Sequence, residues 1–205
     1  MPALTKLRFF ATALLITCAA HMPAAQAALI SFQTPSTDAI SGESVAVDIV
    51  VSGLGNFVPD SLGAFDITVD YDPAAFAFNS YSLGALLGDL GSFEALDASF
   101  GDSGNSVNVA EVSLLSDAAL HALQPGEFVL ATLNFGVLDL AVGATSQLGL
   151  SDSLLADTGG GTLPATVGEP VTFVGAAAVP VSGTLLLLLG GLLNLGLARR
   201  RSVIR

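Results

Sequence analysis

The sequence predicts an all-β domain, an antiparallel β-sandwich, between an apolar leader and an apolar tail. Short segments that alternate apolar and polar residues recur along residues 28–175, and turn-forming residues separate them. No long segment in this range has the apolar period of a helix, and only Ala118–Leu123 has room for a short helical turn. Several short strands without helical crossovers favour two packed antiparallel sheets.

Two segments carry the clearest strand pattern. Residues 44–52 place valine or isoleucine at every odd position up to Val51, and residues 65–71 place aromatic or β-branched side chains at the odd positions. Glycine, proline, asparagine and aspartate after each segment indicate turns. Further strands are predicted at 107–115, 128–138, 147–150 and 171–174.

Residues 1–27 have the features of a signal peptide. Lys6 and Arg8 precede the apolar run 9–17, and an A-x-A site then predicts a cut that also removes Cys18, the only cysteine. A lipoprotein cut before Cys18 is the less favoured alternative, because Thr17 is a poor residue at that position. The exported domain would therefore hold no disulfide. The residues that define the cut are Ala25, Ala27 and Ala28.

The tail, residues 176–205, has the features of a membrane anchor. Residues 179–198 carry no charge and are long enough to cross a hydrocarbon core of ~30 Å, with the span itself predicted at 184–198. Basic residues follow the span and none flank its other end, which predicts that the chain end lies in the cytoplasm and the domain outside. The alternative is a buried terminal helix of a soluble fold. The basic cluster is Arg199, Arg200 and Arg201.

A short motif before the span gives the tail a family resemblance. Val179-Pro180, one apolar span and an arginine cluster resemble a PEP-CTERM sorting signal, although Val181-Ser182 stand where Glu-Pro is usual. The resemblance implies processing by an exosortase, an intramembrane enzyme that cuts near the motif. It also implies a Gram-negative producer that makes exopolysaccharide, and delivery from the inner membrane to the cell surface or extracellular matrix.

The charge distribution limits partners and chemistry. All 18 acidic residues lie between Asp38 and Glu169, whereas the six Lys and Arg residues lie before residue 9 or after residue 198. Nucleic acid and anionic lipid headgroups are excluded as partners of such a domain, and cations, neutral glycans and basic proteins remain. One histidine, His121, without cysteine, lysine or arginine supplies neither a nucleophile–base pair nor a zinc site. The domain is therefore not expected to be an enzyme or to need a cofactor.

One strand concentrates carboxylates. Alternation places Asp66, Thr68, Asp70 and Asp72 on the same side, and no basic residue is present to neutralise them. Hard oxygen ligands of this kind suit Ca²⁺, so Asp66, Asp70 and Asp72 are the candidate metal ligands. The simpler alternative is a solvated strand face.

Residues 62–73, LGAFDITVDYDP, resemble the second-strand region of cohesin-type domains. Residues 41–47, 107–115 and 126–135 resemble the opening, middle and late strands of the same family. The resemblance implies a jelly-roll β-sandwich that binds a dockerin-like protein or a glycan. Two functions are then expected: a non-catalytic exported binding module with the loop 83–105 as a recognition insert, or a structural acidic protein of the exopolysaccharide matrix without a discrete ligand pocket.

Overall fold

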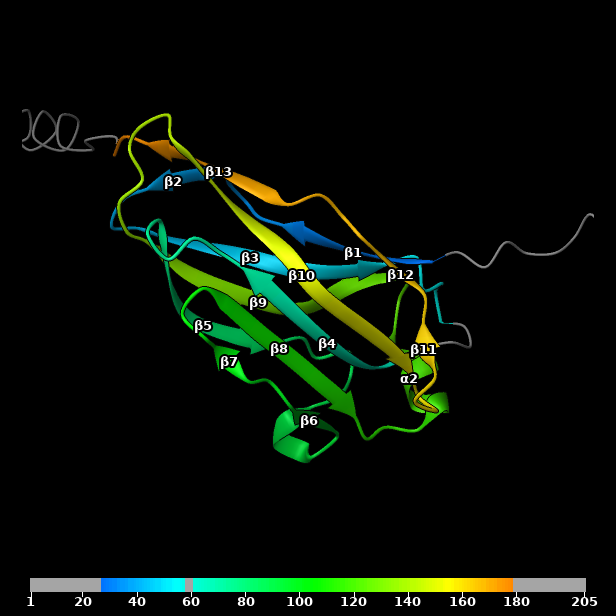
Figure 1. Cartoon of the computed structure of the whole chain (residues 1–205). Coiled ribbons are helices and arrows are strands. Elements are labelled where there is room, and N and C mark those ends of the chain that lie inside the picture. Colours follow the sequence, from blue (N-terminus) through cyan, green and yellow to red (C-terminus); the bar gives the residue numbers. More distant parts are fainter. Residues whose placement is uncertain (1–26, 58–60, 179–205) are drawn as a thin grey trace, which may run out of the picture.

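The computed structural model describes residues 27–57 and 61–178 (Figure 1). Its elements are β1 (Ala28–Gln33), β2 (Asp38–Ile40), β3 (Ser44–Ser52), β4 (Leu62–Asp70), β5 (Phe76–Leu83), the 3₁₀ helix η2 (Leu90–Ser92), β6 (Ala95–Asp97), β7 (Gly101–Asp102), β8 (Ser106–Ser113), α2 (Asp117–Leu123), β9 (Glu127–Val137), β10 (Thr145–Asp157), β11 (Thr162–Leu163), β12 (Ala165–Val167) and β13 (Val171–Ala176). The first sheet has the order β12-β1-β3-β9-β5. The second has the order β2-β13-β10-β4-β8-β6, with β11 paired to β10 and β7 paired to β8. The predicted all-β sandwich is confirmed.

The predicted strands correspond to β3, β4, β8, β9, β10 and β13, and the predicted helical turn is α2. Strands β1, β2, β5, β6, β7, β11 and β12 were not predicted, and two further features differ from the prediction. β10 runs from Thr145 to Asp157, well beyond the predicted 147–150, and the pairing is not wholly antiparallel. β12 runs parallel to β1, and β2 runs parallel to β13. Each parallel pair involves a three-residue strand at the edge of a sheet, where the chain crosses between the sheets instead of turning back in a hairpin.

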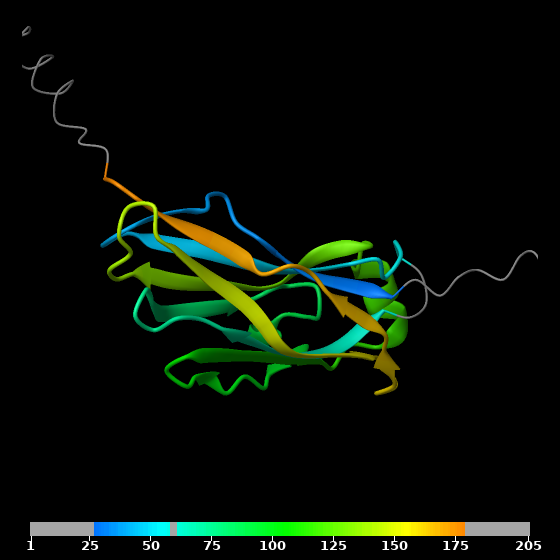
Figure 2. The same cartoon turned by 45° about the horizontal axis from the view of Figure 1, so that its top comes forward.

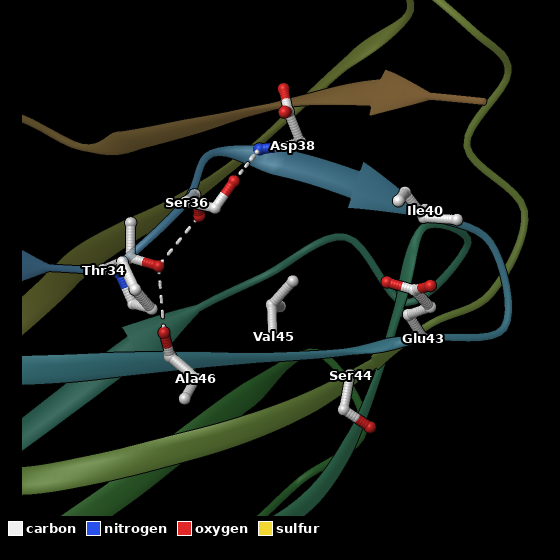
Figure 3. A pocket seen from close by; sticks show the side chains of 9 residues that line it. Thr34, Ser36, Asp38, Ile40, Glu43, Ser44, Val45 and Ala46 are labelled. Carbon is white, nitrogen blue, oxygen red and sulfur yellow. Dashed lines mark hydrogen bonds between the residues drawn. The ribbon is translucent and has the colours of Figure 1, made fainter. Parts of the chain in front are cut away.

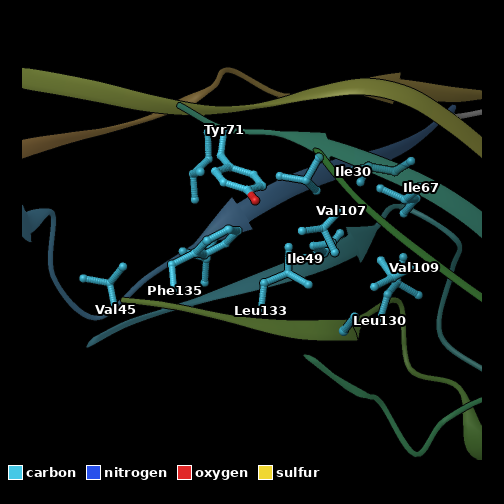
Figure 4. Packing of buried hydrophobic residues seen from close by; sticks show 14 of the residues in the cluster. Ile30, Val45, Ile49, Ile67, Tyr71, Val107, Val109, Leu130, Leu133 and Phe135 are labelled. Carbon is cyan, nitrogen blue, oxygen red and sulfur yellow. The ribbon is translucent and has the colours of Figure 1, made fainter. Parts of the chain in front are cut away.

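The inward residues of both sheets form one hydrophobic core (Figure 4). Phe135 of β9 is its aromatic centre, with ring centroids 5.2 Å from Tyr71, 6.1 Å from Phe76 and 5.7 Å from Phe78. Phe76 in turn lies 5.3 Å from Phe173 of β13. Because these rings come from both sheets, the aromatic contacts join the two layers.

One end of the sandwich is closed by α2, which lies near β11 (Figures 1 and 2). The side chain of Gln124, directly after α2, is buried. It forms hydrogen bonds with backbone groups that a neighbouring strand would otherwise satisfy. Its Oε1 accepts from the Leu62 amide at 2.8 Å, and its Nε2 donates to the carbonyls of Leu62 at 2.8 Å and Leu86 at 3.0 Å. These bonds fix the start of β4. The described chain begins at this end and leaves at the opposite end of the sandwich.

Candidate functional site

The outer face of the second sheet carries a row of apolar side chains across four strands. The register pairs Leu96 of β6 with Val112 of β8, Val112 with Ala64 of β4, and Ala64 with Ala156 of β10. Leu96 is 47% exposed and Val112 40% exposed. Residues paired side by side across neighbouring strands project from the same face. We call these four residues the apolar row.

Further apolar groups extend the apolar row at both sides. Leu154 of β10 pairs with Asp66 on the same face and is exposed, as is Leu114 just after β8. A hollow of about 140 Å³ borders the row, and its lining includes Ala64, Val112 and Ala156 of the row and Leu120 of α2. Gly63 is required there, because a Cβ would lie 2.6 Å from the Asp157 carbonyl oxygen. A face of a strand exposed to solvent is ordinarily polar, so this apolar surface indicates a contact with a partner.

The other half of the same face is polar. Asn108 of β8 donates from Nδ2 to Oδ1 of Asp66 at 2.6 Å and to Oγ1 of Thr68 at 3.3 Å. Ser151 of β10 donates to Oδ1 of Asp70 at 2.9 Å. The two carboxylates are exposed and are held by neighbouring side chains, so the face presents negative charge at fixed positions beside the apolar row.

The structure does not bring the three predicted metal ligands into one group. Asp66 and Asp70 lie on the face just described, as the alternation of β4 predicts. Asp72 lies beyond the end of β4, where its Oδ1 accepts from the Ala74 amide at 2.9 Å and begins a turn. In residues 27–57 and 61–178, no group of three or more His, Cys, Asp or Glu side chains is placed to hold a metal ion. The calcium site stays a prediction.

The predicted recognition insert, residues 83–105, forms the border of this face. It contains η2, β6 and β7, and both strands pair with β8. Phe93 is 79% exposed and Phe100 is 89% exposed, so the insert presents two aromatic rings to solvent. The sequence predicted the insert but not its short strands, because β6 and β7 have too few residues to show alternation.

Two tyrosines fix the insert to the sandwich. Tyr71 donates to Oδ1 of Asp102 at 2.7 Å, and burial followed by this hydrogen bond raises the pKa of Tyr71 to about 12. Tyr81 of β5 donates to Oδ2 of Asp97 at 2.8 Å, which joins the edges of the two sheets. Partial burial alone would raise the pKa of Asp97, but hydrogen bonds from Ser99 and Tyr81 outweigh it and lower that pKa. Asp97 is therefore ionised at neutral pH.

A second hollow, of about 250 Å³, lies where the chain crosses from β1 to β2 (Figure 3). Thr34 closes it on one side by donating to the Ala46 carbonyl at 3.0 Å and the Ser36 carbonyl at 2.9 Å. Its lining residues include hydroxyl side chains beside the carboxylates Asp38 and Glu43, but no histidine, lysine or arginine that could activate a hydroxyl. His121 is half-buried on α2 and is not among the lining residues of this hollow. Neither hollow assembles the groups that acid–base or nucleophilic catalysis requires.

The predicted processing sites lie mostly beyond the described part. Ala28 is the first residue of β1, where its amide donates to the Pro164 carbonyl at 2.9 Å, so the predicted cut after Ala27 would leave β1 whole. Among the described residues, no helix is long and apolar enough to cross a membrane. The remaining predictions fall outside those residues: Ala25, Val179, Pro180, Arg199, Arg200, Arg201 and the span 184–198.

A β-sandwich with an apolar row on one outer face has the architecture of a binding module. The chain belongs to the cohesin domain family, which it matches over residues 30–167, more than half of its length. Cohesin domains bind other proteins and are not catalysts. The predicted cohesin-like domain is thus confirmed.

Solved cohesins share the fold. A type II cohesin from the cellulosome of Acetivibrio cellulolyticus is 18% identical with a TM-score of 0.58, over 72% of this chain and 95% of that one. The sixth cohesin of scaffoldin B from the same organism, solved in complex with a dockerin, is 20% identical with a TM-score of 0.55, over 75% and 99%. A non-cellulosomal cohesin from the archaeon Archaeoglobus fulgidus is 15% identical with a TM-score of 0.55, over 76% and 94%. No curated protein matches the chain.

Proposed function

We propose that this chain is an exported binding module that holds a dockerin-like protein on the outer face of β6, β8, β4 and β10. The observation that carries the proposal is the apolar row on the outer face, in which Leu96 and Val112 are exposed and Ala64 and Ala156 are half-buried. Contact surfaces of this kind combine an apolar centre with a polar border. The complex of a related cohesin with a dockerin supports a protein partner.

The charges on the face specify the chemistry of that partner. Residues 9–198 contain no lysine or arginine, and Asp66 and Asp70 lie beside the apolar row. A partner that packs apolar side chains against the apolar row and places Lys or Arg beside Asp66 and Asp70 would complement both the apolar and the polar half of this face. A glycan is the weaker ligand for the row itself, because its four side chains are aliphatic and the exposed rings of Phe93 and Phe100 lie on the bordering insert instead.

For delivery, we propose the route that the two termini predict. A signal peptide would be cut after Ala27, and the tail would hold the domain at the inner membrane until an exosortase-type enzyme acts near Val179-Pro180. The domain would then reach the cell surface or the exopolysaccharide matrix. A structural role in that matrix is the second candidate, and the acidic charge without any basic residue in the exported domain favours it.

The two candidates are separated by one matched pair of variants. Val112→Asp places a charge in the centre of the apolar row, whereas Val129→Asp places one on the outer face of the first sheet, where Val129 is 36% exposed. Each immobilised variant is exposed to the secreted proteins and polysaccharide of the producing organism. We expect wild type and Val129→Asp to capture a dockerin-containing protein, identified by mass spectrometry, and Val112→Asp to lose at least about tenfold of the captured amount, the loss that ~1.4 kcal/mol produces.

Capture that both variants retain would place the ligand elsewhere and overturn the proposed face. Retention of polysaccharide alone, independent of both substitutions, would support the matrix role instead.

A further inference from the structure

Glu111 of β8 is a buried carboxyl without a hydrogen-bond partner. Its side chain is 0% exposed, and neither Oε1 nor Oε2 has a partner among the described residues. In the register it pairs with Phe65 of β4 on one side and Asp97 of β6 on the other. Val107 and Val109, at the preceding alternate positions, are in the core, so Glu111 points inward between the sheets. An ionised carboxylate in that position is unstable unless it is paired.

No lysine or arginine of the described chain can pair with Glu111. Residues 9–198 contain neither residue type, and the charged group that acts on Glu111 is the carboxylate of Asp97. Phe65 of β4 is apolar, and Tyr81 of β5, on the opposite sheet, already donates to Asp97. Ionisation of Glu111 would thus place two negative charges across the β6–β8 pair.

β6, the strand next to Glu111 on the side of Asp97, is a short strand at the edge of the sheet. β6 has three residues, whose register with β8 joins Ala95, Leu96 and Asp97. Two backbone hydrogen bonds flank this register, from the Leu114 amide to the Glu94 carbonyl at 2.7 Å and from the Ala98 amide to the Ala110 carbonyl at 2.9 Å. β6 also carries Leu96, one end of the apolar row. A short edge strand, which is paired on one side alone, separates at a smaller free-energy cost than a central strand does.

We propose that Glu111 is a proton-controlled latch: while it is protonated β6 stays paired to β8, and when it ionises β6 separates and removes Leu96 from the apolar row. The effect on partner binding rests on the proposed function, whereas the movement of β6 does not. Burial, and to a smaller extent the charge of Asp97, raises the pKa of Glu111 to about 7. The latch would therefore open between mildly acidic and mildly alkaline surroundings.

Hydrogen exchange measured by mass spectrometry on the full chain in mild detergent tests the latch directly. Exchange is compared at pH 5.5 and pH 8, after correction for the intrinsic pH dependence of amide exchange. We expect peptides covering β6 to exchange at least about tenfold faster at pH 8, because a pKa near 7 makes the carboxyl mostly neutral at the first pH and mostly ionised at the second. Peptides covering β3 and β9 serve as the internal reference.

Two variants and one titration make the test specific. Glu111→Gln should abolish the pH dependence at β6, and Asp66→Asn, a change to an exposed carboxylate on the neighbouring strand, should preserve it. If Glu111→Gln does not fold, carbon-13 NMR of wild type labelled at the glutamate carboxyls gives the titration of Glu111 itself. A midpoint near the ordinary value of 4.5, or β6 exchange that is equal at both pH values, overturns the latch. A partner that binds elsewhere would overturn the proposed face and leave these results unchanged.

Discussion

The outer faces of the two sheets differ although the same alternation builds both. On the first sheet Asp48 pairs with Thr132, and its neighbours along β9 and β5 are short polar residues such as Asn134, Ser80 and Ser82. Its exposed large apolar residues, Leu29, Val129 and Val167, do not pair with one another. On the second sheet the apolar residues align across four strands instead.

This difference separates what folds the domain from what the domain binds. The inward positions of both sheets are apolar because they must fill one core, so they do not distinguish the faces. The outward positions are free of that requirement. A continuous apolar row at such positions is therefore attributed to a partner, whereas scattered exposed apolar residues need no explanation.

The largest effect is expected from the core that both faces share. Phe135→Ala removes the ring that contacts aromatic residues of both sheets and should cost about 3–5 kcal/mol of the free energy of unfolding. Chemical denaturation, monitored by hydrogen exchange of peptides from each sheet, should show that both sheets unfold in one transition. Phe100→Ala, at an exposed ring, should change stability by less than about 0.5 kcal/mol. Two separate transitions in the Phe135 variant would mean that the faces belong to independent units.

The next effect concerns the inward side of the second sheet, where Glu111 breaks the apolar pattern. Its pKa in the folded state, about 7, exceeds the ordinary 4.5, so the folded domain keeps a proton that the unfolded chain releases. The free energy of unfolding therefore falls as pH rises from about 4.5 to about 7, by up to ~3 kcal/mol in total. Urea unfolding of Glu111→Gln should lack this slope. A wild type that is equally stable at pH 5 and pH 8 would contradict it.

A smaller effect is expected at the edge where the two sheets meet. Tyr81→Phe removes the hydroxyl that donates to Asp97 across the sheets and should cost about 1 kcal/mol of stability. The ring stays stacked on Phe78, with centroids 6.5 Å apart, so the core contact is preserved. Thermal unfolding measures the loss, and faster exchange at β6 should accompany it. An unchanged melting temperature would show that solvent replaces this hydrogen bond without cost.

The sequence predicted the strands whose alternation is uninterrupted. In β4, Phe65, Ile67 and Val69 are buried as their spacing indicates. β5 was missed because its register shifts between Phe78 and Ser80, and this bulge breaks the period. β10 was underestimated for the same reason, since its pairing with β4 shifts near Asp152.

The candidate site was only half predictable. Asp66 and Asp70 could be placed on a common face from β4 alone. The apolar row could not, because Leu96, Val112 and Ala156 come together only through the pairing of strands that are distant in sequence. Glu111 was missed as well: a charged residue is ordinarily assigned to the surface, and its spacing from Val107 and Val109 was the one signal of its burial.

Calcium gives the smallest expected effect and tests the polar half of the second face. Ca²⁺ takes about 6–8 oxygen ligands, whereas Asp66, Asp70 and Asp72 each accept a hydrogen bond from a different neighbour. Calcium added after EDTA treatment should therefore raise the melting temperature by less than about 1 °C, as for a site that is barely occupied. A rise of several degrees that Asp70→Asn removes would instead confirm the predicted metal ligands. The polar half of this face would then differ from the first sheet by binding a cation, and the apolar row alone would no longer account for the contrast between the faces.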